Sequence, residues 1–132
     1  MSPRLVELDV DECLRLLKGH APHLGRVAFD GPLGPVVLPV NYRVHRGSVV
    51  LLTDPGSKML AAATHERISF QVDSVDPTWQ EGWSVLIHGT GREVTDADER
   101  RAIEDLGLRA WAGSSAHAIE ILPTQITGRR IV

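Results

Sequence analysis

The chain has 132 residues, of which 42% are hydrophobic, and this suffices for one domain with its own core over residues 1–132. Its 14 Lys and Arg residues against 17 Asp and Glu residues leave a net charge of -3, which disfavours a nucleic-acid partner. We expect a cytoplasmic protein with no membrane contact, because no apolar run approaches ~20 residues, no secretion signal is recognisable, and the only cysteine, Cys13, lacks a disulfide partner.

The first half of the chain predicts a helix followed by three antiparallel strands. Asp9 and Glu12 form a capping-box-like pair ahead of an apolar helix that ends at Gly19. Apolar and β-branched residues then predict strands at 24–30, 35–44 and 48–53. Because the links between them are short and contain glycine, we expect these strands to form a meander.

The second half alternates helices and strands. A short helix is predicted from Pro55 through the Lys58 to Ala63 run, and strands follow at 67–75 and 83–94. Gly89 and Gly91 indicate a bend in the second of these strands. The last expected elements are a helix at 95–111 and a closing strand at 118–121 and 125–132, bent at Pro123.

This order of elements favours a mainly β fold with short helices, in the form of a six-stranded antiparallel split β-barrel. Six strands are interrupted by only three helices, which disfavours a parallel doubly wound sheet. A dinucleotide fingerprint is also missing from the sequence, since Gly89-Thr90-Gly91 lies inside a predicted strand and opens no helix.

The passage from the third strand into the short helix is a candidate phosphate site. Thr53, Ser57 and Lys58 would add two hydroxyls and an ammonium to the free N–H groups at the start of a helix. An ordinary helix-initiating turn with a solvated lysine explains the same residues, and the residues alone leave both interpretations open.

The strand at 36–42 is the second candidate segment. Pro39 removes one ladder donor, so the strand is expected to be locally unpaired or edge-like, with backbone groups free for a planar polar ligand. Asn41 could add a donor and an acceptor. A bulged edge strand with a polar residue facing water is the equally common alternative.

Five segments in register resemble the pyridoxamine 5'-phosphate oxidase-like proteins, and most closely the branch that contains nitroimidazole reductase-like members. They are Gly25-Arg26-Val27-Ala28, Leu38-Pro39-Val40-Asn41-Tyr42, Gly56-Ser57-Lys58, Ser69-Phe70-Gln71-Val72-Asp73, and Trp83-Ser84-Val85 with His88-Gly89. The closing Ile126-Thr127-Gly128-Arg129-Arg130 is similar as well, so the resemblance spans nearly the whole chain.

The resemblance implies a homodimeric split barrel with FMN bound in clefts between the subunits. Carried over by position, it implies that Lys58, Ser57 and Thr53 hold the flavin phosphate. It also implies backbone contacts from Leu38, Pro39, Val40 and Asn41 to the isoalloxazine ring, and weaker contributions from Trp83 and Ser84. The arginine-rich substrate motifs of true pyridoxamine 5'-phosphate oxidases are not recognisable here, so we expect little of that activity.

Other reactive residue types are discounted. His20 and His23 flank Pro22 and lack a third ligand, so we expect no metal site. Cys13 lies on the apolar side of the first helix and is interpreted as a core residue. His88 could contact a flavin or a substrate, or be a hydrogen-bonded barrel residue, and its role stays open.

The function expected from the resemblance is that of an FMN-dependent oxidoreductase acting on a small-molecule substrate, with catalytic residues unknown. A non-catalytic flavin-binding protein is the first alternative, because no acid or base is obvious in the sequence. A split barrel that uses a deazaflavin coenzyme or haem is the second alternative. FMN is preferred over deazaflavin because the chain is acidic, whereas the long anionic tail of deazaflavin favours a basic groove.

Overall fold

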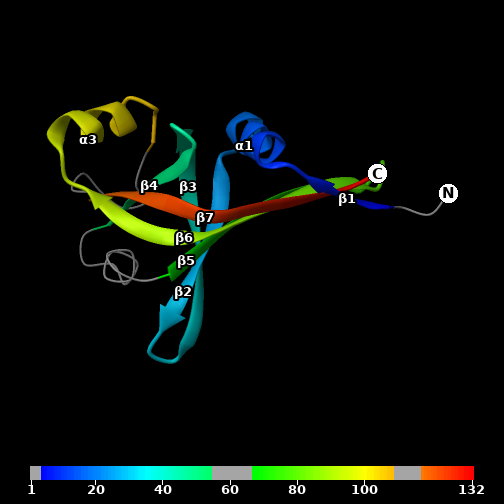
Figure 1. Ribbon diagram of the computed structural model, residues 1–132, viewed down its shortest axis with the longest axis horizontal. Helices are drawn as coiled ribbons and strands as arrows, with labels where there is room; N and C mark the ends of the chain where they lie inside the picture. The colour runs from blue at the N-terminus through cyan, green and yellow to red at the C-terminus, as the bar shows by residue number, and fades with distance from the viewer. Residues whose placement is uncertain (1–3, 55–66, 109–116) are drawn as a thin grey trace.

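A computed structural model describes residues 4–54, 67–108 and 117–132, which form a strongly twisted antiparallel sheet accompanied by two helices (Figure 1). The elements in chain order are β1 (Leu5–Leu8), α1 (Val10–Gly19), β2 (Leu24–Gly31), β3 (Gly34–His45), β4 (Ser48–Thr53), β5 (Arg67–Asp76), β6 (Glu81–Val94), α3 (Ala97–Glu104) and β7 (His117–Ile131).

The sheet closes into a barrel because β7 pairs with both β4 and β6. The strand order is β1-β7-β4-β3-β2-β5-β6, and β6 also pairs with β7. The ring therefore contains six strands, as predicted, and every pairing is antiparallel. The weakest join is β2 with β5, where only three residues of each strand are partners, Arg26 to Ala28 with Ser69 to Gln71.

A seventh strand, β1, was not predicted. It lies outside the ring and pairs with the last residues of β7, from Leu5 opposite Ile131 to Leu8 opposite Gly128. Its four residues are too few for a recognisable alternation, and their extended conformation depends on a partner more than 120 positions along the chain.

Helix α1 begins as the sequence predicts and packs its apolar side on the barrel. The Asp9 carboxylate accepts a hydrogen bond from the Glu12 N–H at 2.8 Å, and Cys13 and Leu17 are buried. The Tyr42 hydroxyl donates to the Leu17 carbonyl oxygen at 2.7 Å and so ties the helix to β3. Burial raises the pKa of the Tyr42 phenol to about 12, so this donor keeps its proton at neutral pH.

The remaining predicted helices differ in outcome. The helix predicted at 95–111 is shorter, because α3 ends at Glu104 and Gly107 then adopts a φ of +81° that favours glycine. The helix predicted from Pro55 to Ala63 lies outside the described residues. The two segments predicted for the closing strand are one continuous strand, β7, with a register shift opposite Gly89.

Two apolar clusters occupy opposite faces of the sheet. The larger one fills the barrel, with Tyr42, Phe70, Leu51 and Ile87 among its fully buried members. The smaller one lies between α3 and the outer side of β4, and Val50 and Ile103 belong to it. Helix α3 thus covers only the part of the outer surface formed by β4 and the adjoining ends of β6 and β7 (Figure 1). The outer side of β2, β5 and the first half of β6 carries polar side chains, such as Arg26, Gln71 and Ser84, together with apolar ones.

Candidate functional site

The outer face of β3, β2, β5 and β6 carries polar and charged side chains with apolar ones between them. Strand partners place Pro39, Arg26, Gln71 and Leu86 in one row across the four strands, on the side opposite the buried Val27 and Phe70. Alternation along each strand puts every second residue on this outer face. We call this surface the outer polar face; its residues are Pro39, Asn41, Leu24, Arg26, Ala28, Val37, Ser69, Gln71, Asp73, Ser84, Leu86 and His88.

Arg26 is the centre of a side-chain network on this face. Its guanidinium donates to the Gln71 side-chain oxygen at 3.3 Å and lies 3.8 Å from the Asp73 carboxylate. Gln71 in turn donates to Asp73 at 3.0 Å. The network thus joins β2 to β5, and its member Asp73 is the strand partner of the predicted site residue Ser84 on β6.

The predicted ring-binding segment on β3 divides between two faces. Val40 is buried in the barrel, and Leu38, on the same side, is 37% exposed. Pro39 and Asn41 therefore point to the outer polar face, where Pro39 is opposite Arg26 and Asn41 opposite Leu24. Residues 34–41 are all partnered with β2, so they are not unpaired, but β4 pairs only with residues 42–45. Among the described strands, residues 34–41 therefore have one unpaired edge, in agreement with the expectation of an edge-like strand.

Thr53, at the end of β4, is buried in an unusual way. Its side-chain oxygen and one carboxylate oxygen of Asp54 are buried and have no hydrogen-bond partner among the described residues. Buried polar groups are almost always partnered, so these atoms point to an interaction with a group outside the described protein atoms. Ser57 and Lys58, the other predicted phosphate-binding residues, lie outside the described residues.

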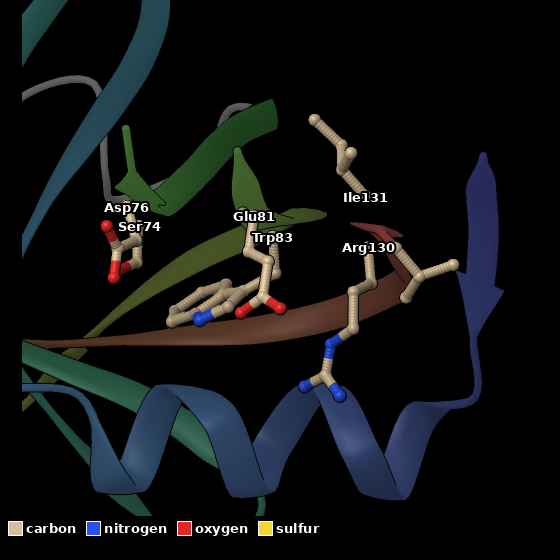
Figure 2. A pocket seen from close by; sticks show the side chains of 8 residues that line it. Ser74, Asp76, Glu81, Trp83, Arg130 and Ile131 are labelled. Carbon is tan, nitrogen blue, oxygen red and sulfur yellow. The ribbon is translucent and has the colours of Figure 1, made fainter. Parts of the chain in front are cut away.

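Trp83 and Ser84 line cavities near the end of the barrel where β1 joins β7. One cavity of about 440 Å³ is lined by Trp83, Asp76, Glu81 and Arg130, with the Arg130 side chain directed toward α1 (Figure 2). Arg130 lies 3.3 Å from the Glu12 carboxylate, and the Trp83 ring meets the His20 ring edge-on at 5.2 Å. A second cavity of about 310 Å³ is lined by Trp83, Ser84, Asp73 and Arg129. Trp83 is thus shared between the two, and Ser84 opens onto the second.

A third cavity, of about 410 Å³, was not predicted. Arg67, Ser69, His88, Thr90 and Thr124 line it on the outer side of β5 and β6. His88 is the only one of these whose possible role the sequence indicated. The others are brought together by strand register between β5, β6 and β7, for which the sequence carries no local signal.

Cys13, which is interpreted from the sequence as a core residue, has that role in the structure. Cys13 is fully buried in the barrel core. Burial is the main cause that raises the pKa of its thiol, and Asp9 and Glu12 raise it further, so the thiol stays protonated and is a poor nucleophile.

Within residues 4–54, 67–108 and 117–132, no three His, Cys, Asp or Glu side chains gather closely enough to hold a metal ion. No helix of the described chain is both long and apolar enough to cross a membrane.

Comparison with known protein families gives one match over most of the chain. The model of the pyridoxamine 5'-phosphate oxidase family matches residues 9–130. The uncharacterized protein Rv0080 of Mycobacterium tuberculosis is 34% identical over 134 residues, which cover 97% of this chain and 86% of that relative.

Solved structures are similar over almost their whole length. The FAD binding protein from Mycobacterium smegmatis matches with a TM-score of 0.81 and 33% identity, over 95% of this chain and 98% of that one. An FAD-binding protein from Mesorhizobium loti matches with a TM-score of 0.79 and 22% identity, over 99% of each chain, and at this identity the likeness concerns the fold alone.

Proposed function

The chain belongs to the pyridoxamine 5'-phosphate oxidase family, and from this premise we propose that it binds a flavin nucleotide next to the outer polar face, between two copies of the chain. The observation that carries the proposal is the buried hydroxyl of Thr53, which has no hydrogen-bond partner among the described residues and lies at a position where the family resemblance implies a contact with the flavin phosphate. A bound nucleotide would supply the missing hydrogen-bond partner.

The residues of the outer polar face fit a flavin in kind. An isoalloxazine ring has apolar faces and a polar edge of carbonyl and N–H groups, and it needs a flat surface with a few polar side chains at its border. Pro39 and Leu24 present apolar surface, and Asn41 and the Arg26 guanidinium present hydrogen-bonding groups on the same face. The network with Gln71 and Asp73 holds that guanidinium in place.

The proposal concerns the part that FMN and FAD share, namely the ring, the ribityl chain and the first phosphate. The family resemblance implies FMN, whereas the Mycobacterium smegmatis protein is an FAD binding protein. Parallel titrations of the purified protein with FMN and FAD, followed by quenching of flavin fluorescence, decide between the two.

A bound flavin would supply hydride or electron transfer, and we propose that the protein is an oxidoreductase acting on a small-molecule substrate.

The visible spectrum of the purified protein loaded with a flavin tests the ligand class. Bands of bound flavin support the proposal, whereas a Soret band would favour haem as the ligand. Retention of the deazaflavin coenzyme in preference to FMN and FAD would favour deazaflavin as the ligand. Turnover with a reductant and an acceptor then separates an oxidoreductase from a non-catalytic flavin-binding protein.

Thr53→Val is expected to have opposite effects on ligand binding and on the stability of the ligand-free protein. Valine has nearly the same shape but no hydroxyl, so flavin affinity should fall by about threefold to tenfold, equivalent to one neutral hydrogen bond. The ligand-free protein should unfold at the same or a higher temperature, because an unpartnered buried hydroxyl is removed. Fluorescence titration and thermal unfolding measure the two effects.

Thr95→Val is the matched control, since Thr95 is exposed between β6 and α3. It should alter neither flavin affinity nor the thermal midpoint. Loss of stability in ligand-free Thr53→Val, with flavin affinity unchanged, would mean that the Thr53 hydroxyl has a protein partner and no role in binding.

A homodimer is the assembly we propose, with the outer polar face buried between the copies. Multi-angle light scattering should give twice the chain mass of 14.4 kDa. Val37 is 60% exposed on this face, and Val37→Asp should shift the protein toward the monomer because it would place a charge in an apolar contact. Val10→Asp, on α1, is the control and should leave the mass unchanged. A monomeric wild-type protein that binds flavin tightly would contradict the shared site.

A further inference from the structure

The cavity lined by Arg67, Ser69, His88, Thr90 and Thr124 is formed by an irregularity in the β6–β7 ladder. His88 is opposite Gln125, but the next residue, Gly89, is opposite Pro123, so Thr124 is an extra residue on β7. The Thr124 hydroxyl donates to the His88 carbonyl oxygen at 3.0 Å and fixes the bulge. Bulges of this kind redirect side chains and are frequent next to functional sites.

The His88 ring is held in one orientation by a hydrogen bond to its neighbour on β5. Its Nδ1 lies 2.7 Å from the Ser69 hydroxyl oxygen, and the two residues are strand partners. With Nδ1 engaged, Nε2 is the ring nitrogen left to meet a ligand. An N–H at Nε2 would be a donor, as is the hydroxyl of Thr90 on the same cavity wall, whereas the Thr124 hydroxyl already donates its proton to the His88 carbonyl oxygen.

The charge of this cavity differs from that of the other two. Arg67 is a cation on its wall, and no carboxylate occurs among the described residues that line it. The cavity of about 440 Å³ contains Asp76 and Glu81 beside its arginine, and the cavity of about 310 Å³ contains Asp73 beside its arginine. Of these three cavities, the one at Arg67 therefore combines a guanidinium with a hydroxyl donor and has no opposing carboxylate among its described lining residues.

We propose that this cavity binds a phosphoryl group. A guanidinium offers paired N–H donors that match phosphate oxygens, and the Thr90 hydroxyl and the His88 imidazole add further donors around them. A volume of about 410 Å³ is within the range of small-molecule sites, so the cavity has room for the atoms next to the phosphorus as well. The phosphoryl group belongs either to a free anion or substrate, or to the outer phosphate of a flavin dinucleotide.

The test uses the ligand-free protein with inorganic phosphate and with pyrophosphate as probes. Addition of either anion should shift the amide NMR signals of Ser69, His88 and Thr90 in a saturable way. Arg67→Gln should weaken this binding by about tenfold to a hundredfold, since a charge-assisted hydrogen bond is lost. Arg4→Gln is the matched control, because it removes the same charge far from the cavity. The Arg4 backbone pairs with Val132, seven residues beyond Gln125, the strand partner of His88, so anion binding should be unchanged.

Flavin titrations of the same variants identify the source of the phosphoryl group. If Arg67→Gln weakens FAD by tenfold or more and leaves FMN and riboflavin unchanged, the cavity serves the outer phosphate of the dinucleotide. If all three flavins are unchanged while pyrophosphate binding is lost, it serves a substrate or a free anion. Either result supports the phosphoryl site.

The proposal is overturned if phosphate and pyrophosphate cause no saturable shift, or if Arg67→Gln and Arg4→Gln weaken the anions equally. A second variant, Ser69→Ala, keeps the test informative if Arg67→Gln folds poorly. It frees the His88 ring and should weaken pyrophosphate by about threefold or more, the loss of one neutral hydrogen bond. These outcomes are independent of flavin binding, because the anions are titrated in its absence.

Discussion

Gly89→Ala is expected to lower the free energy of unfolding by about 3 kcal/mol or more, at the upper end of the cost of overpacking. A Cβ atom at this position would overlap the Leu122 carbonyl oxygen and lie 3.1 Å from the Pro123 Cα. Both obstacles are backbone atoms of β7 at the register shift, so no change of rotamer can relieve the contact. Urea unfolding at fixed protein concentration measures the loss.

Gly19→Ala is the matched control for this substitution. Gly19 is the last residue of α1, and a Cβ there has nothing within 4 Å. Its substitution should be neutral or stabilising by up to about 1 kcal/mol, through helix propensity. Equal effects at Gly19 and Gly89 would mean that the close approach of β6 to β7 is not what requires glycine at Gly89.

Local signals account for much of the fold that the sequence predicts. Asp9 and Glu12 mark the helix start because a cap is a contact between residues three apart. Gly89 marks the irregularity in β6 because only glycine permits that approach of two strands. The six strands of the ring follow from apolar alternation, and their number agrees with the family resemblance.

The parts that the sequence does not predict depend on distant partners. Strand β1 is extended because β7 is beside it, and its four residues have no pattern of their own. Arg26, Gln71 and Asp73 meet only through the register of β2 with β5, which no local rule gives. The cavity at Arg67 likewise depends on the bulge at Thr124, which arises from the pairing of β6 with β7. Ser57 and Lys58 stay predictions.

Phe70→Ala is expected to lower the free energy of unfolding by about 3–5 kcal/mol, the range for removal of a buried aromatic ring. Phe70 is fully buried in the barrel core, and its ring meets the Tyr42 ring at 5.1 Å in an edge-on arrangement. The loss is the cost of the cavity left by the ring together with that aromatic contact. The midpoint of urea unfolding should fall without a change in its slope.

The Phe70 ring also explains why glycine occupies position 25. A Cβ atom at Gly25 would lie 2.5 Å from the Phe70 Cζ, and the buried ring has no free space into which to move. Gly25→Ala alone should therefore cost about 1–3 kcal/mol. In the Phe70→Ala background the added methyl group enters the cavity, so the same substitution should be neutral or stabilising. The double-mutant cycle should give a coupling of at least 1 kcal/mol between the two positions, whereas additive losses would show that the ring does not exclude a side chain at Gly25.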